Sequence, residues 1–413
     1  MEKNSIWTNN QFKLLWTGNI LSEISFNFFT LWLPIVIFFL TQSTLAMGTM
    51  RAIQVLPNIL LGILIGIMID RYNRRNVMIL SSLIIILSLA ILYFLLVFKM
   101  LEIWHIYILG FFIFTFSYTL GNSYDTVIPE IVKDDQLVKA NSSLTLVDST
   151  VNLISPILAG MMYMVDLSIG LVITIMGTLI MLFCSSRLKV TKPKKEAKED
   201  VYKKKSSLKV EFLEGWNALV DNRRLFMLTI SITIMNIASA ASGAVLAFYA
   251  LYNLEISNQT LGIVYSAAAL GGVFAALASN KLKDVLEQDK IFITSVVITA
   301  IGFFVNFIST HWTGLAIGLL LISFGTITTN IYYITLRQKT IESHLLGRVS
   351  GTSSMIMKLA APISFISAGA LGELIEINYI FLSSSIILLI LSVYIYFGFQ
   401  KKVVKNKGGA LFK

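Results

Sequence analysis

Long apolar segments follow one another along almost the whole chain, each about 20 residues long and nearly free of charge. A helix of that length crosses the ~30 Å hydrocarbon core of a bilayer. The pattern therefore predicts an all-α integral membrane protein with twelve transmembrane helices. The expected spans are 12–40, 47–69, 77–98, 103–124, 143–165, 168–186, 226–253, 260–280, 291–308, 312–336, 350–372 and 377–399.

One long polar stretch divides these spans into six and six. It begins with a lysine-rich part whose composition indicates a disordered linker. It continues with VEFLEGWNALV, which places Phe212, Trp216 and Leu219 on one face of a helix. We expect this segment to lie along the inner membrane surface. The predicted organisation is an N-terminal half (1–186), a cytoplasmic linker (187–225) and a C-terminal half (226–413).

The two halves resemble each other at a shift of about 210 residues, which indicates an internal duplication. Gly62 and Asp70 fall opposite Gly272 and Asn280. Two pseudo-symmetric halves around a central pathway are typical of membrane transporters.

Composition and charge narrow the class further. The chain is 56% hydrophobic, and all but three of its 33 Lys and Arg residues lie on one side when both termini are placed in the cytoplasm. This asymmetry sets the orientation, so the net charge of +10 reflects topology and not nucleic-acid binding. The single cysteine, Cys184, excludes an internal disulfide and a multi-thiolate metal site. With no nucleotide-binding or hydrolase motif, we expect no enzyme, no cofactor and no metal.

The segment 61–75, LGILIGIMIDRYNRR, combines glycines with an acidic and basic cluster where a span ends. Small residues allow close helix packing, and arginines hold this end outside the hydrocarbon. The segment resembles the signature loop of the major facilitator superfamily, where Asn73 replaces the usual glycine and predicts a left-handed turn. The resemblance implies a conformational role for Gly62, Gly66, Asp70, Arg71, Arg74 and Arg75.

Further motifs sharpen this resemblance. The segments 128–142 (IPEIVKDDQLVKANS), 155–160 (SPILAG) and 345–351 (LLGRVSG) are similar to the macrolide-efflux branch of drug–proton antiporters in this superfamily. The likeness extends over essentially the whole chain, although Ser155 replaces the first glycine of an antiporter motif. It implies secondary active efflux of amphipathic, macrolide-like or multiple drugs across the plasma membrane, in exchange for protons, by alternating access in a monomer. The alternatives are a siderophore or lipid exporter of the same fold, or a non-transporting membrane receptor.

Glu23 is the main candidate for proton coupling. It lies about 10 residues into the first span, or ~15 Å, near the bilayer midplane. Asn19 and Asn27 flank it at i−4 and i+4. A carboxylate at this depth is costly unless it is paired or faces water, so Glu23 is either a proton carrier or a structural hydrogen-bonding group.

The fifth and eleventh expected spans, 143–165 and 350–372, carry the other charges that lie deep in the membrane. Asp148 is the second proton-coupling candidate, and Lys358 lies 210 positions later. Each could instead be a gate or a packing contact. Pro156 and Pro362 should bend the same two helices, which makes these helices the expected gates. In the family, helices 1, 4, 7 and 10 line the pathway, and their polar positions here are Asn19, Asn27, Tyr118, Asn122, Asp125, Asn236, Asn330 and Tyr333.

Overall fold

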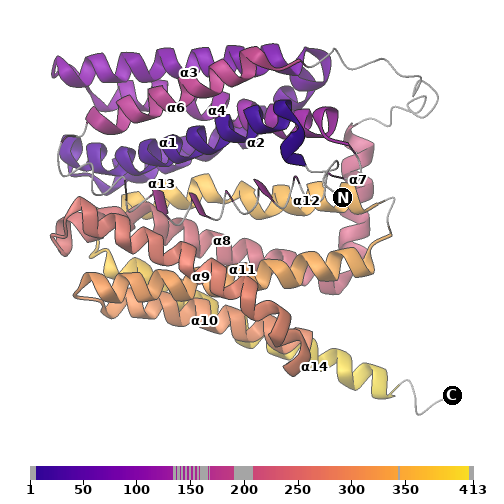
Figure 1. Ribbon diagram of the computed structural model, residues 1–413. Helices are drawn as coiled ribbons and strands as arrows, with labels where there is room; N and C mark the ends of the chain where they lie inside the picture. The colour runs from indigo at the N-terminus through magenta and orange to yellow at the C-terminus, as the bar shows by residue number, and fades with distance from the viewer. Residues whose placement is uncertain are drawn as a thin grey trace. The chain divides into compact units, whose positions relative to one another are not determined.

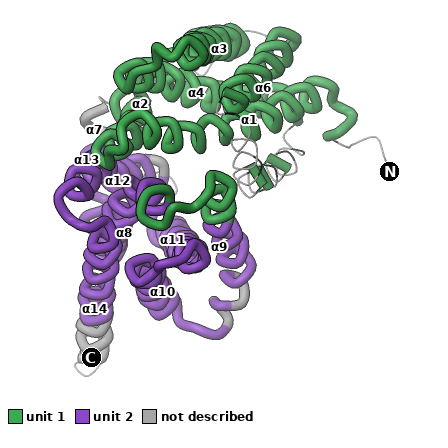
Figure 2. The backbone as a smooth tube through the Cα atoms, turned by 90° about the vertical axis from the view of Figure 1, so that its left-hand side faces the viewer, with its two compact units in different colours: residues 1–203, 251–266 green, residues 204–250, 267–413 purple. Residues whose placement is uncertain are grey.

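The computed structural model describes residues 6–133, 136, 140, 143–144, 147, 150–151, 154–155, 158, 166, 168–189, 208–342 and 345–408. Within these ranges the regular structure is helical and contains no β-strand. The chain divides into two compact units, which Figure 2 colours separately: unit 1 is residues 1–203 with 251–266, and unit 2 is 204–250 with 267–413.

Unit 1 is a bundle of long helices (Figure 1). Helix α1 packs against α6, α3 packs against both α4 and α6, and α2 packs against α4. Its described helices are α1 (Asn10–Thr41), α2 (Thr44–Arg71), α3 (Arg74–Val97), α4 (Ile103–Ile131) and α6 (Ser168–Arg187).

Unit 2 contains the remaining helices, except that residues 251–266, with the end of a π-helical turn and the first residues of α9, belong to unit 1. Helix α10 packs against α11 and α14, while α8 packs against α13 and α14. The helices are α7 (Leu208–Asp221), α8 (Arg223–Phe248), a π-helical turn (Tyr249–Asn253), α9 (Asn258–Val285), α10 (Gln288–Ile308), α11 (Trp312–Thr340), α12 (Leu346–Leu359), α13 (Ala361–Leu371) and α14 (Asn378–Gly408).

Ten helical segments of the described chain are long and apolar enough to cross a membrane. Helix α2, with 28 residues, occupies the position of a further expected span. Most of the expected span 143–165 lies outside the described residues. The all-α fold expected from the sequence is confirmed, and the chain is a multi-pass membrane protein.

Prolines act differently in different helices. Helices α1 and α2 run continuously through Pro34 and Pro57. The expected span 350–372 is instead interrupted at Ala360, so that Pro362 stands at the start of α13, where its missing N–H costs no helical hydrogen bond. The expected bend in this helix is therefore a break between two shorter helices.

The expectation of a left-handed turn at Asn73 is wrong. Asn73 has φ −65° and ψ 116°, an extended conformation. Its side-chain oxygen accepts a hydrogen bond from the Arg75 N–H at 3.0 Å and caps α3. Asparagine is among the residues preferred at a helix N-cap, and this role replaces the need for glycine.

Candidate functional site

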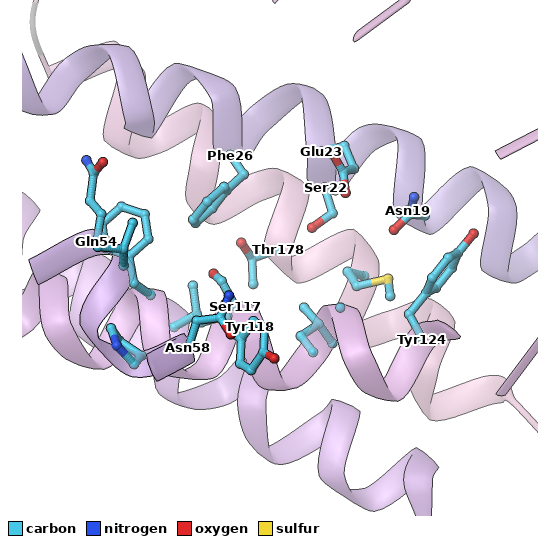
Figure 3. A pocket seen from close by; sticks show the side chains of 17 residues that line it. Asn19, Ser22, Glu23, Phe26, Gln54, Asn58, Ser117, Tyr118, Tyr124 and Thr178 are labelled. Atoms are coloured by element: carbon cyan, nitrogen blue, oxygen red, sulfur yellow. The ribbon is translucent and has the colours of Figure 1, made fainter. Parts of the chain in front are cut away.

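A cavity of about 340 Å³ lies within unit 1. Its walls come mainly from α1, α2 and α4, with smaller contributions from α3 and α6. Figure 3 shows the polar side chains of α1 on one side and those of α2 and α4 on the other. The polar lining residues are Asn19, Ser22, Glu23, Gln54, Asn58, Ser117, Tyr118, Tyr124 and Thr178.

Helix α1 presents one face to the cavity because its neighbouring face is fixed against α6. A Cβ built on Gly18 would lie 2.9 Å from the Cβ of Cys184, so the two helices touch closely there. Two turns further along α1, the Thr174 hydroxyl donates a hydrogen bond to the Ser25 carbonyl at 2.9 Å. These contacts orient α1 so that four residues at i, i+3, i+4 and i+7 line the cavity, namely Asn19, Ser22, Glu23 and Phe26.

Glu23 is half-buried on the cavity wall (Figure 3). Among the described residues that line the cavity, it is the one with a formal charge. Asn27 does not join it there, since its Nδ2 group donates to the Glu23 backbone carbonyl at 3.0 Å. The polar stripe expected on this helix is therefore divided, with Asn19 and Glu23 at the cavity and Asn27 bonded to its own helix.

Helix α4 divides its polar residues in the same way. Tyr118 lines the cavity, together with Ser117 and Tyr124. The Asn122 amide donates to the Tyr118 backbone carbonyl at 2.7 Å, and Asp125 is exposed away from the cavity lining. Of the three α4 residues expected on the pathway, only Tyr118 reaches the cavity.

Aromatic rings and a glycine shape the remaining wall. The rings of Phe26 and Phe114 meet edge to face, with their centroids 5.7 Å apart. A Cβ built on Gly121 would meet no atom of the described chain within 4 Å, so this residue leaves space in the cavity. The cavity thus combines one carboxyl group, neutral hydrogen-bonding groups and aromatic surface.

The arginines that follow α2 connect the ends of three helices. Arg74 donates to the Thr126 carbonyl at 3.0 Å and forms an ion pair with Glu130 on α4. Arg75 donates to the Ser186 carbonyl on α6. Arg71 is exposed.

Neither motif glycine makes a close contact with another helix among the described residues. A Cβ on Gly62 would lie 3.7 Å from the Tyr118 hydroxyl, an ordinary contact distance. One on Gly66 would meet nothing within 4 Å among the described atoms. The side chain of Asp70 lies outside the described part of the structure.

Two of the candidates in unit 2, Asn236 and Tyr333, make packing contacts. Asn236 donates to the Met357 carbonyl at 3.1 Å, beside the break between α12 and α13. Tyr333 is 2% exposed, and its hydroxyl lies 2.9 Å from the Thr229 hydroxyl. Asn330 is half-buried and Lys358 is exposed. Asp148 and Pro156 lie outside the described residues.

Several lining residues are not among those expected from the sequence. Ser22 and Phe26 could have been found from their spacing to Asn19, because all three share a helical face. Thr178 gives no such signal, since α6 is not a pathway helix in the family architecture. Its hydroxyl donates to the Thr174 carbonyl at 2.8 Å, so it offers an acceptor oxygen to the cavity.

Comparison with known proteins identifies a matching family and several relatives of this chain. The family model of the Major Facilitator Superfamily matches residues 15–255 and 228–411. Macrolide efflux protein A of Streptococcus pyogenes is 24% identical over 416 residues, which cover 95% of this chain and 96% of that protein. Macrolide efflux protein A of Enterococcus faecalis is 24% identical over 335 residues, covering 76% and 97%. A bacterial homologue of the iron transporter ferroportin, solved in an inward-facing state, shares the fold with a TM-score of 0.75 at 16% identity, covering 95% of this chain and 99% of that one.

The apolar helices, the cavity and these relatives together define a membrane transporter and not an enzyme. The chain belongs to the Major Facilitator Superfamily. Its sequence relatives place it in the macrolide-efflux-like branch of that superfamily.

Proposed function

We propose that this transporter exports amphipathic, macrolide-like drugs across the plasma membrane in exchange for protons, by alternating access between its two halves. The main support is the position of Glu23, a carboxyl group on the wall of a cavity whose other described lining residues are neutral. The relatives named macrolide efflux protein A support the drug class.

The cavity fits part or all of an amphipathic ligand. Ligand pockets typically occupy about 300–1,000 Å³ and combine apolar walls with a few polar groups. Phe26 and Phe114 supply aromatic surface, while Asn58 and Tyr118 supply groups that donate and accept hydrogen bonds.

Proton coupling requires one group that binds a proton in one state and releases it in another. Glu23 can do this because amide and hydroxyl groups, such as those of Asn19 and Ser22, can hydrogen-bond to either form of a carboxyl group. A hundredfold difference in drug affinity between the two protonation states corresponds to a coupling free energy of about 2.7 kcal/mol. Asp148 is the second proton-coupling candidate in this proposal.

Conformational change is assigned to the ends and breaks of helices. Arg74 and Arg75 join the start of α3 to α4 and α6, and a contact of this kind can bias two states without being needed for folding. The break before Pro362 supports a gating role for that helix, with Lys358 beside it. We further propose a monomer with both termini in the cytoplasm, on the basis of the Lys and Arg distribution.

Inverted membrane vesicles carrying the full chain test this function. Vesicles with an imposed proton gradient are offered radiolabelled macrolides, siderophores and lipids, with and without a protonophore. We expect macrolides to accumulate and the accumulation to vanish when the protonophore collapses the gradient. Accumulation of siderophore or lipid alone would support the alternative exporters, and uptake that ignores the gradient would exclude antiport.

A further inference from the structure

Helix α7 lies in a different direction from the helices around it. Figure 1 shows α7 running crosswise to α8, α11 and α12 of the same unit. Because those neighbours belong to membrane-spanning segments, a helix crosswise to them runs along the plane of the membrane.

One face of α7 is packed against its own unit. Leu219 is completely buried in a cluster with Leu225 of α8 and Val349 of α12. A Cβ built on Gly215 would lie 2.6 Å from the Arg348 carbonyl, so α7 and α12 touch backbone to backbone at this point. These contacts fix which way the other faces of α7 point.

A second face is apolar and exposed. Four large side chains on it are between 37% and 44% exposed, and at 3.6 residues per turn they form a stripe roughly 100° wide. We call it the α7 stripe, and its members are Phe212, Leu213, Trp216 and Val220. The third face is polar, with Glu214, Asn217 and Asp221.

Aromatic contacts join the stripe to a spanning helix. The rings of Phe212 and Trp216 stack with their centroids 6.3 Å apart. Trp216 also meets the ring of Phe226, in the first turn of α8, edge to face at 6.2 Å. The stripe is therefore continuous with the end of a helix that crosses the membrane, where hydrocarbon gives way to headgroups.

We propose that the α7 stripe docks on the bilayer, at the boundary between acyl chains and headgroups, and that α7 is an interfacial anchor for α12. A helix with one packed, one apolar and one polar face can contact protein, lipid and water at once. These three environments meet at the membrane surface. Tryptophan is enriched at that depth because its ring is apolar and its N–H is polar. An ion pair between Glu214 and Arg348 adds to the connection with α12. Docking of α7 on the bilayer requires neither the drug nor the coupling ion.

Site-specific fluorescence tests the docking. The full chain carries Cys184→Ala, so that a single new cysteine can be labelled with a small fluorophore, either Leu213→Cys on the stripe or Asn217→Cys on the polar face. Both versions are reconstituted in vesicles of phosphatidylcholine and phosphatidylglycerol with no other protein present. Quenching by a nitroxide lipid labelled near the headgroup is compared with quenching by aqueous iodide.

We expect the ratio of lipid to iodide quenching to be several-fold higher at position 213 than at 217. Val220→Cys provides a second stripe position and should follow Leu213→Cys. Equal ratios at all three positions would overturn the proposal, since they would show that the stripe lies no closer to lipid than the polar face does.

Discussion

The two units use corresponding positions in opposite ways. In unit 1, Asn19 and Tyr124 line an open cavity. Their counterparts 210 and 209 positions later are Thr229 and Tyr333, whose hydroxyls hydrogen-bond to each other in a buried contact. At these two pairs of positions, the described residues therefore line a cavity in unit 1 and pack against each other in unit 2.

The charged residue Glu23 of unit 1 also has an uncharged counterpart in unit 2. Glu23 faces the cavity in unit 1, whereas Thr233, 210 positions later, donates its hydroxyl to the Thr229 backbone carbonyl at 2.8 Å. A threonine hydroxyl does not ionise at neutral pH, so it cannot replace a carboxyl group as a proton carrier. In our proposal, unit 1 carries the proton-binding group at these positions, and the corresponding residues of unit 2 make packing contacts.

The largest expected effect is on the packing of unit 2. A Cβ on Gly325 would lie 2.4 Å from the Ser295 carbonyl, a backbone atom that cannot move aside. Gly325→Val should therefore destabilise the protein by about 1–3 kcal/mol, the usual cost of overpacking. The measurement is the thermal denaturation midpoint of the purified protein, with Gly121→Ala as the matched control that should leave it unchanged. Equal midpoints for both variants would contradict the difference in packing between these two positions.

The next effect is on transport. Gly121→Leu places a side chain where the cavity has space, so the protein should fold normally and transport bulky macrolides several-fold more slowly. Initial rates in vesicles, normalised to the amount of inserted protein, measure this effect. Wild-type rates would show that the substrate does not occupy this part of the cavity.

Replacement by phenylalanine should have different effects at Tyr333 and at Tyr124. Tyr333→Phe removes a buried hydrogen bond and should cost about 0.5–1.5 kcal/mol of stability while leaving the transport rate unchanged. Tyr124→Phe should instead lower the apparent affinity for drug, because Tyr124 lines the cavity. Denaturation midpoints and concentration-dependent transport distinguish these outcomes, and a reversal of the two would contradict the comparison.

The smallest change in free energy is expected at the arginines after α2. Arg74→Ala and Glu130→Gln each break a partly exposed ion pair, which is worth about 0.2–1 kcal/mol. We expect several-fold slower transport with normal membrane insertion for both, and the same result for Asp70→Asn. Non-additive rates in the double variant would confirm the pairing, and absence of all variants from the membrane would show that this loop is needed for folding.

The helices were predictable because hydrocarbon thickness sets their length and apolar composition. The residues at which the helices end were harder to predict. Helix α4 continues past the expected end at 124 to Ile131, beyond the apolar segment. In this added part, Glu130 forms an ion pair with Arg74. Asn73 could be mistaken for a left-handed residue because asparagine suits both that conformation and an N-cap.

The site was predictable only in part. Helical spacing placed Asn19 and Glu23 on one face, but it could not show that Asn27 would bond to its own backbone. The contributions of α2 and α6 to the cavity depend on how helices pack in space, and no local pattern reports this. The sequence predicts an amphipathic α7 segment, whereas only the structure shows that Leu219 is buried against α12.

The most direct test of the account is drug-induced proton release in inverted vesicles that carry Glu23→Gln, compared with wild type. Glutamine keeps the shape of the side chain and its capacity to hydrogen-bond, but it has no group that titrates near neutral pH. We expect this variant to bind drug, to release no protons on drug addition and to accumulate no drug against a gradient. Glu23→Asp should retain part of the proton release and part of the uphill transport. Proton release and uphill transport at wild-type levels in the glutamine variant would contradict the account and remove Glu23 from the coupling mechanism.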